Sequence, residues 1–495
     1  MSASDQLRAA IEQRVTSLAS SLPSDRTNAI VALVGAIDRL SPVDLAPGKV
    51  NPFTGVPTPS LGANRARQLV LDAPDRRCTN SPDLECWAES FLEQSCEVAR
   101  AELVLAHVET GFMRLDVRPD GTVEARISQR HPPDRWRERA DDAWWSAWLE
   151  RNRPESGSSI HDRAHSLVSR LAHPYDLTPS VAIDGVRVGL ALEVLAALMV
   201  MAERDGGPVY RRDELILHVA RDLDAQSACV DAVLEILTLG QNNAAWHAAV
   251  PGIADPPIVR LSNGMVVLSR RGLTTDPFRF LTRELRRRAP EAYHAAAANR
   301  EAPFRNDLYT IFGHRRFVTS PGRIELKGER GSNRTDIDAA IFDRKTGTLA
   351  IFELKTHEPF ARSTAELLRT QANVRAAARQ VAGALDWINR HEADEILNRI
   401  DRRTAKGYRV HKVQPFVLGR YLMDRSPLDR RAVWATWPQL LRVLGGSKIE
   451  DLGANPIMSL ASRLQQDSPI VSPLDVVDTT TVSFGDVTLT VHARR

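Results

Sequence analysis

Apolar positions recur at helical spacing along most of the first 250 residues, and segments rich in proline and glycine interrupt this pattern. The first forty residues follow the helical period, whereas residues 41–62 break it as a loop does. Apolar and polar residues then alternate on both sides of Pro119-Asp120-Gly121, which predicts a β-hairpin. We therefore expect residues 1–155 to form a helical N-terminal region with one hairpin.

Residues 156–290 have the pattern of a second unit, in which helices precede a short hairpin. Helical spacing covers three segments, at about residues 188–202, 212–223 and 227–239. Asn263-Gly264 is a strong two-residue turn signal. This order resembles a winged helix, whose wing would carry Arg260, Arg270 and Arg271. Many small α+β domains share the order, so DNA binding by this unit is one of two interpretations that stay open.

Two segments further along the chain have the pattern of neighbouring strands. Residues 335–342 and 348–355 alternate in the strand period on either side of a Thr-Gly turn, and both faces carry apolar residues. Strands of this kind lie in the middle of a sheet that helices cover. The same segments also carry four charged residues, which are Asp336, Asp338, Glu353 and Lys355.

The turn between the two strands decides whether these charges meet. A four-residue loop, at residues 344–347, places Asp338 opposite Glu353. It also places Asp336 opposite Lys355, so that all four side chains share one face. A loop one residue shorter would divide them between the two faces, unless a β-bulge restored the register.

Two carboxylates that face each other on neighbouring strands repel, and each raises the pKa of the other. A divalent cation removes this repulsion, and carboxylate oxygens are the ligands that Mg²⁺ and Mn²⁺ prefer. Such a metal can activate water against a phosphodiester, while a nearby lysine orients the water or stabilises developing charge. The alternative is a surface hairpin whose acids are solvated, but the segments have no polar face.

The segments "DIDAAIF" and "FELK" resemble the metal-binding strands of the PD-(D/E)XK nuclease superfamily, in particular its restriction-endonuclease-like and Mrr-like members. The resemblance assigns metal binding to Asp338 and Glu353, and it makes Lys355 the third catalytic residue. Ile337 stands where many members have proline. The resemblance covers about residues 300–445, where a helix, a strand, the two motif strands and a second helix follow one another in the order of the family.

Two helices that flank the motif strands extend the resemblance. The family places an acid on the helix before the strands, and Glu301 corresponds to it here. The helix after the strands often carries a glutamine and basic residues, which correspond to Gln380 and to Arg375 and Arg379. Glu301 and Gln380 are thereby implied as further catalytic residues and the two arginines as nucleic-acid-binding residues, although another acid or Gln371 could take either role.

The resemblance implies a C-terminal α/β domain at residues 291–447, with a central mixed sheet flanked by helices, followed by an extension with a β-hairpin at residues 448–495. The implied activity is metal-dependent hydrolysis of DNA, as in an endonuclease that needs Mg²⁺ or Mn²⁺ and serves bacterial antiviral defence, restriction or repair. One alternative is a non-catalytic DNA-binding or scaffold protein that retains the nuclease fold. Another is a nuclease that cuts RNA, because this metal chemistry does not select the sugar.

Charge adds a candidate DNA-binding surface. The whole chain has 65 basic and 62 acidic residues, which gives no general indication of a polyanionic partner. Residues 279–334, however, hold 13 lysines and arginines against 6 acids, including the consecutive Arg286, Arg287 and Arg288. We expect these three arginines to contact DNA phosphates, with a solvated helix face as the alternative.

The cysteines bear on the cellular compartment. The four cysteines form no CxxC pair, and the N-terminus does not resemble a signal peptide, so we expect reduced thiols in a cytoplasmic protein without structural zinc. The apolar run that begins at Val188 contains Glu193 and is shorter than a membrane span, which predicts a buried helix. A homodimer or a partner from a defence system would be compatible with the sequence.

Overall fold

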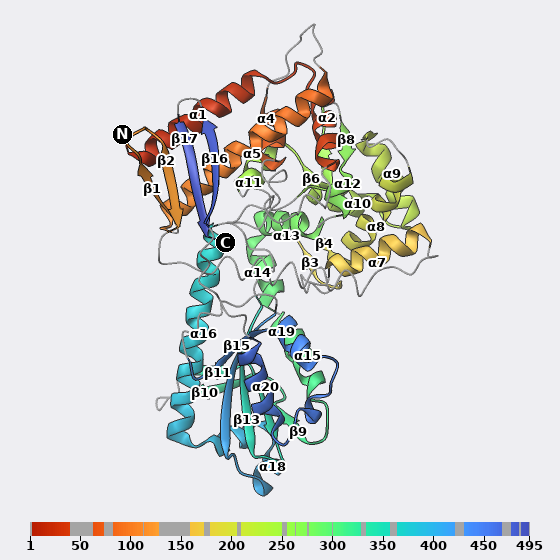
Figure 1. Cartoon of the computed structure of the whole chain (residues 1–495). Coiled ribbons are helices and arrows are strands. Elements are labelled where there is room, and N and C mark those ends of the chain that lie inside the picture. The colour runs from red at the N-terminus through yellow and green to blue at the C-terminus, as the bar shows by residue number, and fades with distance from the viewer. Residues whose placement is uncertain are drawn as a thin grey trace.

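The computed structural model has a mixed α/β fold in which two parts lie end to end (Figure 1). Of the residues that the structure describes, those up to 298 and those in 477–494 form the N-terminal part, and those between 300 and 467 form the C-terminal part. The structure describes residues 2–39, 63–73, 83–111, 113–127, 159–172, 179–204, 209–249, 255–262, 264–274, 277–298, 300–327, 333–356, 364–420, 430–467, 477–484 and 487–494.

A layer of helices forms the first core. Its helices are α1 (Ala3–Ser20), α2 (Arg26–Asp38), α4 (Ala63–Asp72) and α5 (Leu84–Glu109). Side-chain caps fix where they begin: the hydroxyl of Ser2 accepts from the backbone N–H of Asp5, and Asp25 caps α2. Apolar side chains such as Leu7, Leu33 and Val98 are fully buried between the helices, so burial of one face of each helix stabilises this layer.

A four-stranded sheet packs on these helices. Its strands are β1 (Met113–Val117), β2 (Val123–Ile127), β16 (Val477–Phe484) and β17 (Val487–Arg494), in the order β1-β2-β17-β16. The predicted hairpin around Pro119 is confirmed, and Gly121 supplies the positive φ of 85° that its turn needs. Strand β17 pairs in parallel with β2 and buries Leu489 in the N-terminal core.

The second unit combines helices with short strands. Its elements are α7 (Ile160–Ala172), β3 (Ala182–Ile183), β4 (Val186–Arg187), α8 (Val188–Arg204), β5 (Val209–Arg211), α9 (Arg212–Asp222), α10 (Ser227–Ile236), β6 (Thr238–Leu239), α11 (Gln241–Ala248), β7 (Ile258–Arg260), β8 (Met265–Leu268), α12 (Arg270–Thr274), α13 (Pro277–Arg288) and α14 (Pro290–Ala298). The three predicted helices and the hairpin are confirmed as α8, α9, α10 and β7–β8. Strand β8 also pairs with β5, and the sheet order is β5-β8-β7-β6.

Helix α8 is the buried helix that the apolar run predicts. Val194, Leu195 and Leu198 are fully buried in it. Of the helices that the structure describes, none combines the length and the apolar composition needed to cross a membrane.

The C-terminal part is built on a five-stranded sheet. Its elements are α15 (Glu301–Ile311), β9 (Phe317–Thr319), β10 (Ile324–Lys327), β11 (Asn333–Ile337), β12 (Ala339–Asp343), β13 (Thr348–Lys355), α16 (Thr364–His391), α17 (Ala393–Ile400), α18 (Arg402–Gly407), β14 (Lys412–Gly419), β15 (Val433–Thr436), α19 (Trp437–Leu444), the 3₁₀ helix η3 (Ile449–Asp451) and α20 (Pro456–Gln466). The order β15-β14-β13-β12-β9 is mixed, because β13, β14 and β15 are parallel while β12 is antiparallel to both of its neighbours.

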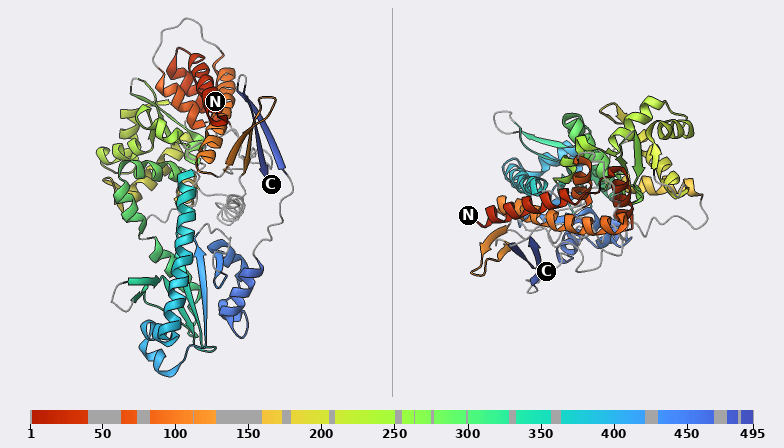
Figure 2. Two further views of the ribbon diagram at one scale, coloured as in Figure 1. Left: turned by 90° about the vertical axis from the view of Figure 1, so that its left-hand side faces the viewer. Right: turned by 90° about the horizontal axis from the view of Figure 1, so that it is seen from above.

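Helices cover both faces of this sheet. On one face, α15, α19 and α20 bury Phe304, Leu440 and Leu460 against the strands. On the other face, α16 and α17 bury residues such as Trp387 and Ile396, and the small β10–β11 sheet packs there as well. Helix α16 runs lengthwise along the C-terminal part toward the N-terminal part (Figures 1 and 2).

The packing moves both predicted boundaries of the C-terminal domain. Helix α14, inside the predicted range 291–447, buries Tyr293 in the core of the second unit. Helix α20, inside the predicted extension 448–495, buries Ile457 and Leu464 in the core of the C-terminal part. The hairpin that follows was predicted, but it joins the N-terminal sheet through β17. The predicted extension is therefore shared between the two parts, while the predicted boundary near residue 155 lies outside the described residues.

Candidate active site

The register of the two motif strands is the predicted one. Strands β12 and β13 pair from Ala339 with Phe352 to Asp343 with Thr348, around a loop of residues 344–347. Gly347 closes this loop with a φ of 65°, and its backbone N–H donates to the oxygen of Asp343 at 2.9 Å. A Cβ atom at this glycine would lie 2.3 Å from the ring of His411, so only glycine fits here without a shift.

The segment before Asp338 differs from the prediction of one continuous strand. The chain leaves the sheet at Asp338, and the residues before it form β11, which pairs with β10 and places Asp336 opposite Glu325. The predicted pairing of Asp336 with Lys355 is therefore wrong, because β10 supplies another partner for these backbone groups. Asp338 itself stays attached to β13, since its N–H donates to the oxygen of Phe352 at 3.2 Å.

Asp338 is a buried carboxylate next to two other charged residues. Its Oδ2 accepts from the backbone N–H of Leu354 at 2.8 Å. Arg305, on α15, donates to the backbone oxygen of Asp338 and pairs with Glu301 one turn earlier. Burial, followed by the negative charge of Glu301, raises the pKa of Asp338 to about 6. The predicted residue Glu301 thus lies close enough to influence the site.

Glu353 is buried on the next strand and is still more perturbed. Burial and then the charge of Asp338 raise the pKa of Glu353 to about 8. The ammonium group of Lys355, two residues further along the same face, contacts the Glu353 carboxylate and partly offsets this rise. Asp338, Glu353 and Lys355 therefore meet in one place, as the turn length predicts.

Helix α16 brings a fourth predicted residue to the site. Lys355 Nζ donates to Oε1 of Gln380 at 3.0 Å, and Nε2 of Gln380 donates to Asp336 at 3.3 Å. The helix is held there because Trp387 is buried against the sheet and the Thr335 hydroxyl donates to the backbone oxygen of Gln380. The side chain of Gln371, the alternative glutamine, lies outside the described residues.

The donor set decides whether a metal ion fits. Among the side chains that the structure describes, no group of three His, Cys, Asp or Glu residues is arranged to hold a metal. The two carboxylates of Asp338 and Glu353 remain, and Mg²⁺ commonly binds through one or two carboxylates while water and substrate phosphates complete its shell. A cation would also relieve the repulsion that raises both pKa values. These two residues therefore fit such an ion.

Two predicted nucleic-acid-binding residues lie on α16, the helix that carries Gln380. Arg375 and Arg379 are exposed and stand one helical turn apart, and Arg379 directly precedes Gln380. Neither pairs with an acid among the described residues. Both guanidinium groups are consequently accessible to a phosphate backbone.

The arginine cluster at the end of α13 has a different environment. Arg287 pairs with Glu284 at 2.7 Å, and Arg288 contacts Glu284 at 2.9 Å and Glu235 at 3.6 Å. Although burial alone would raise the pKa of Glu284, hydrogen bonds from Arg287, His247 and Arg288 hold it well below its ordinary value. That Arg286, Arg287 and Arg288 bind DNA stays a prediction, and for Arg287 and Arg288 a phosphate would have to compete with the existing ion pairs to Glu284 and Glu235.

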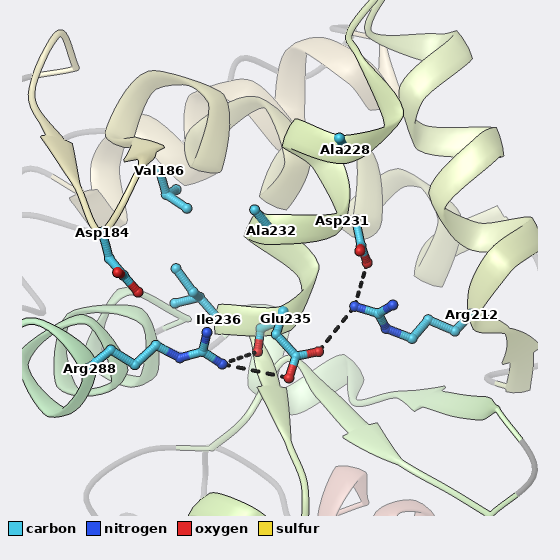
Figure 3. A pocket seen from close by; sticks show the side chains of 9 residues that line it. All are labelled: Asp184, Val186, Arg212, Ala228, Asp231, Ala232, Glu235, Ile236 and Arg288. Atoms are coloured by element: carbon cyan, nitrogen blue, oxygen red, sulfur yellow. Dashed lines mark hydrogen bonds and ion pairs between the residues drawn. The ribbon is translucent and has the colours of Figure 1, made fainter.

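A pocket of about 350 Å³ beside α10 bears on the winged-helix interpretation. Figure 3 shows Arg212 between Asp231 and Glu235, with pair distances of 2.5 and 3.1 Å. Helix α10, which a winged helix would place on DNA, carries these two acids and no lysine or arginine.

Two of the three predicted wing arginines also pair with acids. Arg260 pairs with Glu235, and Arg271 pairs with Asp255 at 2.9 Å. The backbone N–H groups of Arg270 and Arg271 donate to Asp38 on α2, which holds this segment against the first helical layer. The order of elements matches a winged helix, but α10 carries acids and no basic residue, and Arg260 and Arg271 are paired with acids.

No protein-family model, curated protein or solved structure matches the chain. Sequence reasoning missed Arg305, which is positioned by its helical spacing from Glu301, and it missed the contact between Asp336 and Gln380. It also overlooked that "SACVDAVLEI" contains two acids and no basic residue, a signal against DNA binding by α10.

Proposed function

We propose that the C-terminal part is a metal-dependent nuclease that hydrolyses phosphodiester bonds in DNA. The observation that carries the proposal is the meeting of Asp338, Glu353 and Lys355 at one place in the sheet, where both carboxyl groups have a raised pKa. Buried like charges of this kind destabilise a fold, and such arrangements cluster at functional sites. A mixed sheet with helices on both faces supports assignment to the restriction-endonuclease-like fold.

The residues divide the chemistry among them. Asp338 and Glu353 would hold Mg²⁺ or Mn²⁺, which when bound polarises a phosphate oxygen and lowers the pKa of water. Lys355 lies next to these carboxylates and can orient the attacking water or stabilise charge that develops on the phosphate. Gln380 holds the Lys355 ammonium group, while Arg375 and Arg379 offer contacts to the phosphates that flank the scissile bond.

The biological setting rests on analogy with the nuclease family alone. A cytoplasmic nuclease of this kind would act in defence against foreign DNA, in restriction or in repair, and the N-terminal part would recognise the substrate or a partner.

Cleavage by the purified full-length chain tests the proposal. The substrates are linear, supercoiled, single-stranded and methylated DNA together with RNA, each with Mg²⁺, Mn²⁺ or a chelator. We expect metal-dependent cutting of DNA, and we expect Lys355→Ala to lower the rate by about 10²–10³ while DNA binding persists. Asp338→Asn should also be inactive, but with a defect in metal titrations.

Lys345→Ala is the matched control, because this exposed lysine lies in the loop at the opposite end of the same two strands. If the wild-type chain binds DNA but cuts no substrate with either metal, the non-catalytic alternative replaces the proposal. Cutting confined to RNA would replace DNA as the substrate. Full activity of Lys355→Ala would refute the site assignment.

A further inference from the structure

A chain of polar contacts leads away from Lys355 to a residue outside the metal-binding pair. Lys355 Nζ donates to Oε1 of Gln380 at 3.0 Å, and Nε2 of Gln380 donates to Oδ1 of Asp336 at 3.3 Å. The other oxygen of Asp336 pairs with Arg323 at 3.0 Å. Asp336 is two residues before Asp338, but it belongs to the β10–β11 sheet, and its hydrogen bond toward the site is the one with Gln380, while its negative charge also raises the pKa of Asp338 and of Glu353.

The partners of the Gln380 amide fix which way the amide points. An amide group has an acceptor end and a donor end, while an ammonium group can only donate and a carboxylate can only accept. Gln380 must therefore turn its oxygen toward Lys355 and its nitrogen toward Asp336. If the amide were rotated, a donor would face the ammonium and an acceptor would face the carboxylate, so Asp336 selects the orientation that holds Lys355.

The elements that carry this chain of contacts are fixed by packing. The β10–β11 sheet buries Ile324 and Ile337 against α16. The indole N–H of Trp387 donates to the backbone oxygen of Lys327 at 2.9 Å, and the Thr335 hydroxyl donates to the backbone oxygen of Gln380 at 3.3 Å. Asp336 and Gln380 are therefore held at a set distance by contacts that do not involve Lys355.

We propose that Asp336 is a positioning residue, which orients the Gln380 amide and thereby holds the Lys355 ammonium group beside Glu353. This inference rests on the proposed nuclease function for its effect on rate, but the contacts themselves can be tested without it. Asp336 would act on the turnover of bound DNA, because two contacts connect it to the Lys355 ammonium group and it has no contact with the exposed arginines of α16.

The first experiment measures cleavage by variants that remove or reverse the contacts. Asp336→Ala takes away the acceptor, and Gln380→Glu places a carboxylate against Asp336. We expect each to lower kcat about tenfold, the effect of losing one charge-assisted hydrogen bond, without changing the affinity for DNA. The double variant Gln380→Glu with Asp336→Asn should recover most of the rate, because the new amide donates to the new carboxylate, whose second oxygen still accepts from Lys355.

Glu325→Ala is the matched control for this series. Glu325 lies opposite Asp336 in the same pair of strands and also pairs with Arg323, at 3.7 Å, but it has no contact with Gln380. The control should cut at the wild-type rate. Equal losses in Glu325→Ala and Asp336→Ala, or a double variant no faster than Gln380→Glu alone, would overturn the proposal, because general disturbance of the hairpin would then explain the data.

A second measurement does not depend on cleavage. Acetylation of the Lys355 amine by acetic anhydride, followed by mass spectrometry of the metal-free protein, reports how firmly the amine is held. We expect Asp336→Ala to be acetylated several-fold faster than the wild type, the control or the double variant. An unchanged acetylation rate in Asp336→Ala would refute the role of Asp336, whereas a wild-type chain that cuts no nucleic acid would refute only the nuclease function.

Discussion

Buried acids lie at both ends of the strand pair β12–β13, but the two ends differ in how many hydrogen-bond donors surround these acids. At one end, Asp343 accepts from Arg316 at 2.6 and 2.7 Å, from the Lys345 N–H at 3.0 Å and from the Thr346 hydroxyl at 2.6 Å. At the other end, the charge of Asp338 acts on Glu353, and Lys355 there is in contact with Glu353 and with Gln380 on α16.

Burial alone does not distinguish these acids. Asp343, Asp338 and Glu353 have exposed fractions of 0%, 4% and 3%. Burial would raise the pKa of Asp343, but its hydrogen bonds from Arg316, Thr346 and Lys345 lower it, whereas the pKa values of Asp338 and Glu353 rise to about 6 and about 8. A buried acid with enough donors holds a turn together, while buried acids that lack them destabilise the strands and are available to a cation.

The largest change in stability should come from a substitution of Asp343, the buried acid that has enough hydrogen-bond donors. Asp343→Asn removes the charge that Arg316 faces, and the Arg316 side chain is itself mostly buried. We expect the free energy of unfolding to fall by about 3–5 kcal/mol, the typical result of removing one partner from a buried ion pair. Urea denaturation monitored by circular dichroism measures the change.

The exposed acid Asp386 provides the control for this substitution, since the same Asp386→Asn change should alter stability by less than about 0.5 kcal/mol. A loss at Asp343 no larger than the loss at Asp386 would mean that the pairing with Arg316 contributes little. Asp343 would then not stabilise the fold as the comparison between the two ends of the strands requires.

Glu353→Gln, at the other end of the strands, should make the fold more stable than the wild type, and this gain should grow as the pH increases. Burial and the charge of Asp338 raise the pKa of Glu353 from 4.5 to about 8, so the folded chain keeps a proton that the unfolded chain releases. The stability that this group contributes is present below the unfolded pKa and is lost as the pH rises through the folded pKa. Glu353→Gln removes the titration and should therefore gain on the order of 1–3 kcal/mol over the wild type between about pH 5 and pH 9.

Urea titrations of both proteins across this pH range test the sign. The activity of Glu353→Gln should be lost at every pH, so that stability and catalysis change in opposite directions. A difference in stability that stays constant with pH would show that the pKa of Glu353 is close to its ordinary value, and the site would then lack the electrostatic strain on which the comparison depends.

The sequence predicted the site better than its surroundings, for a physical reason. The length of the loop at residues 344–347 and the strand period together fix which side chains share a face, so Asp338 and Glu353 could be paired from local pattern alone. Where Asp336 lies depends on β10, a partner that no local pattern identifies. The pairing of β17 with β2, which are more than 350 residues apart, is likewise set by tertiary packing.

Ion pairs between residues that are distant in the chain could not be predicted from a count of basic residues. Counting basic residues in 279–334 identified Arg287 and Arg288, but it could not reveal that Glu284 is buried or that Glu235, on α10, faces the same arginines. Arg375 and Arg379, which the family resemblance implied, have no acid partner among the described residues. The number of positive charges is therefore a weaker guide to DNA binding than the number that remain unpaired in the fold.

This difference between the two arginine groups leads to the smallest expected effect. Replacing Arg375 and Arg379 together with glutamine should reduce the slope of log affinity against log salt by about 1.8, because each lost phosphate contact contributes about 0.9. Replacing Arg287 and Arg288 should leave the slope unchanged and lower the free energy of unfolding instead, since Glu284 would lose two of its buried partners. Fluorescence anisotropy of a labelled duplex, with a chelator present to prevent cutting, measures both slopes.

The two double variants serve as controls for each other, because each removes two positive charges from the same chain. A general effect of net charge would change both slopes equally, whereas direct contact changes only that of the α16 variant. If the Arg287 and Arg288 variant lost the salt dependence and the α16 variant kept it, DNA would bind at the second unit and away from the carboxylates. Cleavage at Asp338 and Glu353 would then require the DNA to reach across both parts of the molecule, and the duplex length needed for cutting would measure that separation.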